Sequence, residues 1–102
     1  MKICADVKFT PVSEGGMQDQ YFSGMRPSFN IDGQLIMCSF EVVSGSEVIQ
    51  AGEVRLVRVN LPHFNLVEKY LKIGASFKFN SGGRVLGSGT IKAIETGFDP
   101  GT

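Results

Sequence analysis

Apolar and polar residues alternate along several short stretches of the chain, beginning close to the N-terminus. Ile3, Ala5, Val7 and Phe9 are separated by residues of mostly polar character. Successive side chains of a β-strand point to opposite faces, so this period of two predicts a strand with one buried and one solvated face. Pro11 ends the run, because proline has no backbone N–H for strand pairing.

The same pattern recurs between residues 28 and 61. Residues 28–31 form a short predicted strand, and Asp32-Gly33 is a tight-turn signal. Residues 35–43 are a second long strand, whose inner row consists of Ile36, Cys38, Phe40 and Val42. Residues 53–61 are a third, in which the apolar positions change phase between Leu56 and Val57. A β-bulge at that point would re-aim the side chains, and we therefore expect one there.

The remaining segments are shorter or less regular. Residues 13–27 are polar and glycine-rich and are expected to form a long loop, whereas residues 64–71 fit either a short helical turn or an irregular strand. Phe77 and Phe79 begin a last hairpin that turns at residues 80–83 and returns through 85–94. Many short strands with turn signals and hardly any helical period predict an all-β sandwich or barrel.

The length of 102 residues allows one domain with one core. We place this domain at residues 1–95. Residues 96–102 contain Gly97, Pro100 and Gly101 and are expected to form a flexible tail.

Four glycines lie within the last hairpin, FKFNSGGRVLGSGTIKAI. A phosphate-binding loop would need a lysine and a hydroxyl at fixed spacing, or a helix that starts after the glycines, and the sequence has neither. Gly82-Gly83 fits a hairpin turn that needs positive φ. Gly87 and Gly89 are two residues apart and therefore share one face of the return strand. Their missing side chains would allow a sharp bend or close packing of another backbone, as small barrels require.

Charge and composition exclude several classes of function. Ten basic and ten acidic residues give a formal net charge of zero, which argues against sequence-independent binding to nucleic acid. No apolar run is long enough for a membrane span, and the N-terminus has no apolar signal-peptide region. We therefore expect a cytoplasmic protein with no membrane and no DNA partner. The two cysteines, Cys4 and Cys38, lack metal-site spacing and are expected to be free thiols.

Two motifs in this chain resemble the C-terminal β-barrel, or third domain, of bacterial elongation factor Tu. GGRVLGSGTI, residues 82–91, is similar to the end of that barrel, where a Gly-Gly-Arg hairpin is followed by Gly-x-Gly and an apolar strand. EGGMQDQYFSGMRPSF, residues 14–29, resembles its stretch of Gly-Gly, paired aromatics, Gly-x-Arg-Pro and an aromatic. The resemblance extends from about Ala5 to Ile94. It implies a small antiparallel Greek-key β-barrel of about six strands, as a stand-alone domain without the GTPase domain.

The resemblance also implies a binding role rather than a catalytic one. The third domain of that family has no catalytic residues; it binds part of the tRNA T-stem and contacts the nucleotide-exchange partner. The candidate partner-binding residues are Met17, Gln18, Tyr21, Met25, Arg26 and Arg84, because methionine, aromatic and arginine side chains are suited to protein interfaces. Met17 and Gln18 stand where the family usually has an Arg-His pair near the tRNA backbone. Losing these cations weakens a phosphate contact, so the sequence favours a protein partner, within the translation machinery, over tRNA.

Several of these candidates also have a purely structural interpretation. Arg26, beside Pro27, could bind a partner's carboxylate or tie a fixed loop to carbonyl groups, and the same alternatives apply to Arg84. In the first loop we expect Phe22 to point inside, with Met17 and Met25 more exposed.

No constellation of catalytic or metal-binding residues is recognisable. His63, the only histidine, has no nucleophile fixed near it by a motif, and Glu14, Asp19 and Asp32 fit solvated loop charges. No cofactor motif is present. We therefore expect a non-catalytic binding module rather than an enzyme. The alternative is an RNA-binding accessory protein that uses Arg26, Arg84, Lys78 and Lys92.

Overall fold

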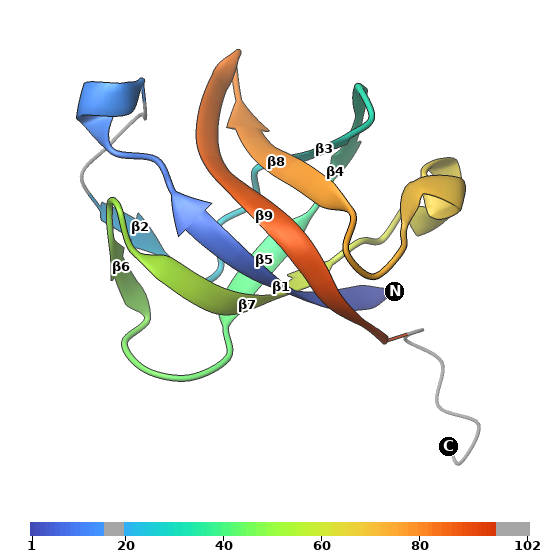
Figure 1. Cartoon of the computed structure of the whole chain (residues 1–102), viewed down its shortest axis with the longest axis horizontal. Coiled ribbons are helices and arrows are strands. Elements are labelled where there is room, and N and C mark those ends of the chain that lie inside the picture. The colour runs from blue at the N-terminus through green and yellow to red at the C-terminus, as the bar shows by residue number, and fades with distance from the viewer. Residues whose placement is uncertain (16–19, 96–102) are drawn as a thin grey trace.

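The chain is all-β in the computed structural model, which describes residues 1–15 and 20–95 (Figure 1). The strands are β1 (Lys2–Phe9), β2 (Gln20–Phe22), β3 (Ser28–Ile31), β4 (Gln34–Met37), β5 (Ser39–Val42), β6 (Val48–Gln50), β7 (Val54–Asn60), β8 (Ser76–Ser81) and β9 (Arg84–Glu95). Three 3₁₀ turns join them: η1 (Val12–Glu14), η2 (Phe64–Leu66) and η3 (Glu68–Tyr70). The predicted tail at 96–102 lies outside the described residues.

Seven of these strands form one curled antiparallel sheet in the order β4-β3-β8-β9-β1-β7-β5, and β2 pairs with β6 in a small separate ribbon. β4 and β5, at the two ends of this order, are successive parts of one strand separated only by Cys38. Because its first part pairs with β3 and its second part with β7, this bent strand draws the two ends of the sheet together. The predicted small antiparallel barrel is confirmed, with strand 35–43 divided at Cys38.

The inward rows of the strands supply the core, as the alternation predicts. Ile3, Ala5, Val7 and Phe9 are fully buried, and three of the four predicted inner residues of the second strand are buried as well. Six aromatic rings form a continuous chain through the core, with successive ring centroids 4.7 to 5.5 Å apart. In order of contact they are Tyr21, Phe9, Phe40, Phe79, Phe77 and Phe29.

Gly87 and Gly89 of β9 lie where this strand packs closely against β1. A Cβ on Gly89 would lie 2.6 Å from Cζ of Phe77 and 2.9 Å from the backbone oxygen of Asp6. A Cβ on Gly87 would lie 2.9 Å from Cγ1 of Val7. Figure 1 shows β9 bending along its length beside β1, its partner in the sheet. The predicted close approach of a neighbouring backbone is therefore confirmed.

The predicted bulge near Leu56 and Val57 is wrong. β7 pairs with β1 without a register shift, from Val54 opposite Lys8 to Asn60 opposite Lys2. The change of phase has another cause: Val54 and Leu56 are apolar residues on the outer face, 62% and 40% exposed, whereas Val57 lies inside. Register shifts occur instead along β9, opposite Cys4/Ala5 of β1 and Phe79/Asn80 of β8.

Two irregular segments also take defined forms. Residues 64–71 adopt the helical alternative, as the 3₁₀ turns η2 and η3. The segment 13–27, predicted as one long loop, includes the end of η1 and the whole of the short strand β2, so the expectation of a single loop is wrong.

Cys38 is the more protected of the two thiols, which are both free. Its Sγ donates a hydrogen bond to the carbonyl of Pro27 at 3.2 Å, and burial raises the pKa of the Cys38 thiol from 9.0 to about 12. Because the folded state favours the neutral thiol, its stabilising contribution is complete below pH 9.0 and declines as pH rises towards about 12.

We therefore expect one thiol, that of the half-buried Cys4, to react with an alkylating reagent in the native protein at pH 8.5, and both to react in denaturant. Mass spectrometry of the alkylated protein measures this directly, and a Cys4→Ser variant should remain unmodified until it unfolds. Equal alkylation rates at Cys4 and Cys38 in the native protein would contradict the buried position of Cys38.

Candidate functional site

The first contact region suggested by the sequence, residues 17–26, is split by the fold. Met17 and Gln18 lie outside the described residues. Tyr21 is fully buried, and its hydroxyl donates a hydrogen bond to the carbonyl of Thr10 at 2.8 Å. This is a correction, because Tyr21 cannot present its ring to a partner from the core. β2 alternates Gln20 outward, Tyr21 inward and Phe22 outward.

Phe22 is therefore the exposed aromatic residue of this region, with 46% of its surface accessible, and the expectation that it points inside is wrong. Its backbone N–H donates to Sδ of Met25 at 3.3 Å, and the Met25 N–H donates back to the Phe22 carbonyl at 3.3 Å. Met25 is half-buried against the core, so it is less exposed than the sequence suggested. A small turn thus fixes Phe22 relative to the barrel.

The segment that follows is held against β5 by backbone hydrogen bonds. The N–H of Gly24 donates to the carbonyl of Phe40 at 2.7 Å, and the N–H of Phe40 donates to the carbonyl of Met25 at 3.1 Å. Farther along, the N–H of Cys38 donates to the carbonyl of Pro27 at 3.3 Å. This pairing places the exposed Arg26 at a defined position on the barrel surface.

Arg26 lines a hollow of about 260 Å³ at the junction of this segment with β1, β5 and β7. Its other lining residues are Lys2, Gly24, Ser39, Phe40, Glu41, Arg58 and Asn60. Nε of Arg58 is paired with a carboxylate oxygen of Glu95 at 3.0 Å. Within residues 1–15 and 20–95, Arg26 has no ion-pair partner, so its guanidinium is available to an acidic group from outside.

Arg84 lies elsewhere, at the start of β9 in the β8–β9 hairpin. Gly82 and Gly83 form the turn before it with φ of 57° and 97°, as the sequence predicts. Arg84 is exposed, and its backbone carbonyl accepts a hydrogen bond from Nδ2 of Asn80 at 3.5 Å. Arg84 is not among the residues that line the Arg26 hollow.

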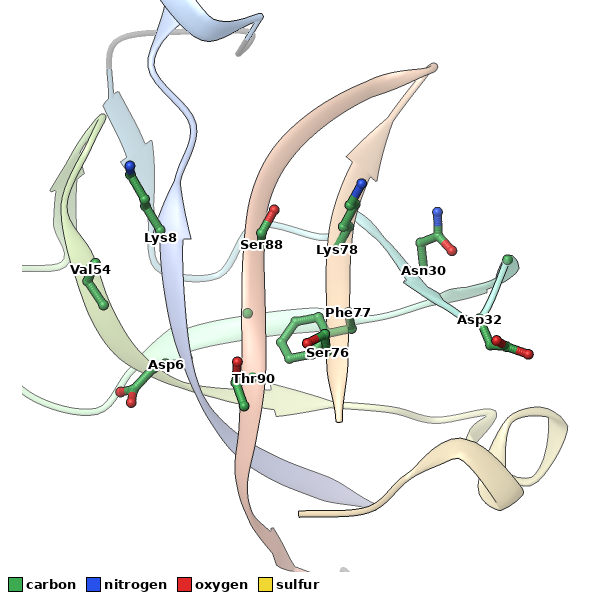
Figure 2. A pocket seen from close by; sticks show the side chains of 12 residues that line it. Asp6, Lys8, Asn30, Asp32, Val54, Ser76, Phe77, Lys78, Ser88 and Thr90 are labelled. Atoms are coloured by element: carbon green, nitrogen blue, oxygen red, sulfur yellow. The ribbon is translucent and has the colours of Figure 1, made fainter. Parts of the chain in front are cut away.

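A larger groove, which the sequence did not indicate as a unit, lies on the outer face of the sheet across β7, β1, β9, β8 and β3 (Figure 2). Its volume is about 620 Å³. The lining residues are Asp6, Lys8, Asn30, Asp32, Gly33, Val54, Ser76, Phe77, Lys78, Ser88, Gly89 and Thr90. Among these residues, the sequence indicates Lys78 as a contact of the RNA-binding alternative, Asp32 as a solvated loop charge in a turn with Gly33, and Gly89 as a site of close packing.

Other candidate chemistry remains dispersed. The exposed His63 lies at the start of η2. Within the described ranges, no three histidine, cysteine or acidic side chains come together in a way that could hold a metal ion. The same ranges contain no helix with the length and apolar character needed to cross a membrane. A scan of this chain against models of known protein families finds no match.

Proposed function

We propose that this chain is a non-catalytic binding module that resembles the third domain of elongation factor Tu without its GTPase domain, and that it acts through protein contacts with translation components. The observation that carries this proposal is the fixed surface formed by Phe22 and Arg26. An exposed aromatic ring lies four residues from an arginine that has no ion-pair partner in the described ranges. Aromatic and arginine side chains are enriched where proteins bind each other.

Backbone pairing makes this surface suitable for binding. The hydrogen bonds from residues 24–27 to Cys38 and Phe40 already hold the segment in place, so binding would not need to order it. The fold supports the same proposal, because the curled antiparallel sheet is of the kind that the resemblance implies. The expected partner offers an apolar pocket for Phe22 and a carboxylate for Arg26.

Affinity capture from a bacterial lysate, followed by identification of bound protein and RNA, tests this function. The wild-type chain is expected to retain translation proteins. A double variant, Phe22→Ser with Arg26→Gln, is expected to reduce their recovery about tenfold or more, because it removes two central contacts.

The matched control is Leu66→Ser with Lys69→Gln, which removes one exposed apolar residue and one cation elsewhere on the barrel. Its recovery of translation proteins should equal that of the wild type. Capture of no translation component by the wild type would refute the proposal. Recovery of tRNA alone, unaffected by Phe22→Ser, would instead support the RNA-binding alternative.

A further inference from the structure

The groove on the outer face of the sheet holds two lysines beside its central strand and the carboxylate of Asp32 at its β3–β4 side. Strand register aligns Lys8 of β1 with Ser88 of β9, Ser88 with Lys78 of β8, and Lys78 with Asn30 of β3. Figure 2 shows Lys8 and Lys78 on either side of Ser88. Adjacent strands are about 4.8 Å apart, so the two lysines stand on strands roughly 10 Å apart and their flexible side chains can reach one anion above Ser88.

The shape of the groove follows from the same register. The central strand contributes the short side chains Ser88 and Thr90 to the outer face, whereas β1 and β8 contribute long lysines beside them. A row of short residues between longer ones leaves a trough. Its volume of about 620 Å³ falls within the range of small-molecule sites.

The charges of the groove leave its lysine end free for an anion. Asp6, the nearest acidic residue on β1, is paired with Lys92, its carboxylate oxygen 3.5 Å from Nζ. Lys8 and Lys78 have no ion-pair partner among the residues that the structure describes. Two ammonium groups and a hydroxyl are suitable ligands for a phosphate.

The opposite end of the groove offers acceptors. Asp32 occupies the β3–β4 turn with φ of 51°, exposed and without an ion-pair partner in residues 1–15 and 20–95. The amide of Asn30 lies between this carboxylate and Lys78, as Figure 2 shows. A carboxylate repels a second phosphate but accepts hydrogen bonds from hydroxyl groups.

We propose that this groove binds a sugar phosphate, either free or as part of a nucleotide. The phosphate lies on Lys8, Ser88 and Lys78, and the sugar hydroxyls donate to Asp32 and Asn30. The groove shares no lining residue with the Arg26 hollow, so this proposal does not depend on the proposed protein contact.

Titration of the ¹⁵N-labelled protein with ribose 5-phosphate tests the proposal, with amide shifts as the readout. Saturable shifts are expected at Lys8, Lys78, Ser88 and Asp32 within a range up to about 10 mM, ten times a Kd of about 1 mM. The double variant Lys8→Gln with Lys78→Gln should bind at least about tenfold more weakly. The control Lys2→Gln with Arg84→Gln makes the same change of net charge at exposed positions away from the groove and should bind like the wild type.

Two further measurements test the phosphate contact and the sugar contact separately. Asp32→Asn should weaken ribose 5-phosphate about threefold to tenfold and leave the affinity for inorganic phosphate unchanged. Unphosphorylated ribose should produce no saturable shift, and AMP should bind through the same residues if nucleotides are a source of the ligand.

Absence of saturable shifts with ribose 5-phosphate, or equal binding by the Lys8/Lys78 double variant, would overturn the proposal. Saturation by a single-stranded oligonucleotide without saturation by ribose 5-phosphate would overturn it too, and would assign this face to an RNA strand. An unchanged affinity in Asp32→Asn would disprove the sugar assignment.

Discussion

Phe79→Ala is expected to lower the free energy of unfolding by about 3–5 kcal/mol, the range for truncating a fully buried phenylalanine. Phe79 has no exposed surface and contacts two other members of the aromatic chain, with centroids 5.1 Å from Phe40 and 5.4 Å from Phe77. Its removal would interrupt the chain at its centre and leave a cavity between strands that the sheet holds apart. For a domain with an ordinary free energy of unfolding, about 5–15 kcal/mol, this loss is a large part of the total.

Urea denaturation followed by circular dichroism measures this effect. Phe22→Ala removes an identical side chain from a half-exposed position and should change stability by less than about 1 kcal/mol. The contrast also tests the orientation of β2, because an inward Phe22 would give a loss similar to that of Phe79→Ala. Losses of similar size at the two positions would contradict the described core.

Gly89→Ala is expected to destabilise the barrel by about 1–2 kcal/mol. Alanine gains about 0.4–1 kcal/mol because it restricts the unfolded chain. Overpacking, however, costs about 1–3 kcal/mol, and one atom in the way is the backbone oxygen of Asp6, only 2.9 Å from the new Cβ. Since this oxygen belongs to the paired strand β1, the sheet itself would have to move, and the steric term should exceed the gain.

Thermal unfolding should show the Gly89→Ala loss as a decrease in Tm, about 4–8 °C for each kcal/mol in a domain near this size. Ser88→Ala changes the neighbouring, outward-facing residue and should alter stability by no more than about 0.5 kcal/mol. A Gly89→Ala variant as stable as the wild type would show that β9 can separate from β1 without cost.

Local patterning predicts the elements of this fold well. Alternation of period two locates β1 and the bent strand β4–β5, because burial of one face acts on every second residue. Asp32-Gly33 is identified as a turn because both residues must take positive φ, and they do, at 51° and 79°. Gly89 is recognised because a strand interior rarely accepts a glycine without close packing.

Features that depend on tertiary pairing could not be predicted in the same way. In β2, three residues are too few to fix which of Tyr21 and Phe22 points inward, and the hydrogen bond from Tyr21 to the carbonyl of Thr10 decides in favour of tyrosine. The groove depends on the register between Lys8 and Ser88, which no local pattern contains. Val54 and Leu56 are apolar residues on the outer face, and in the sequence they produce the same change of phase as a β-bulge would.

The hydrogen bonds from residues 24–27 to Cys38 and Phe40 have a consequence beyond positioning Arg26. β5 ends the sheet order, and a terminal strand with unpaired amide and carbonyl groups is a template on which another copy of a protein can polymerise. Here the free edge of β5 is already paired with residues 24–25 of the same chain. The segment that we assign to partner recognition thus also covers an edge strand on which another copy could otherwise pair and aggregate.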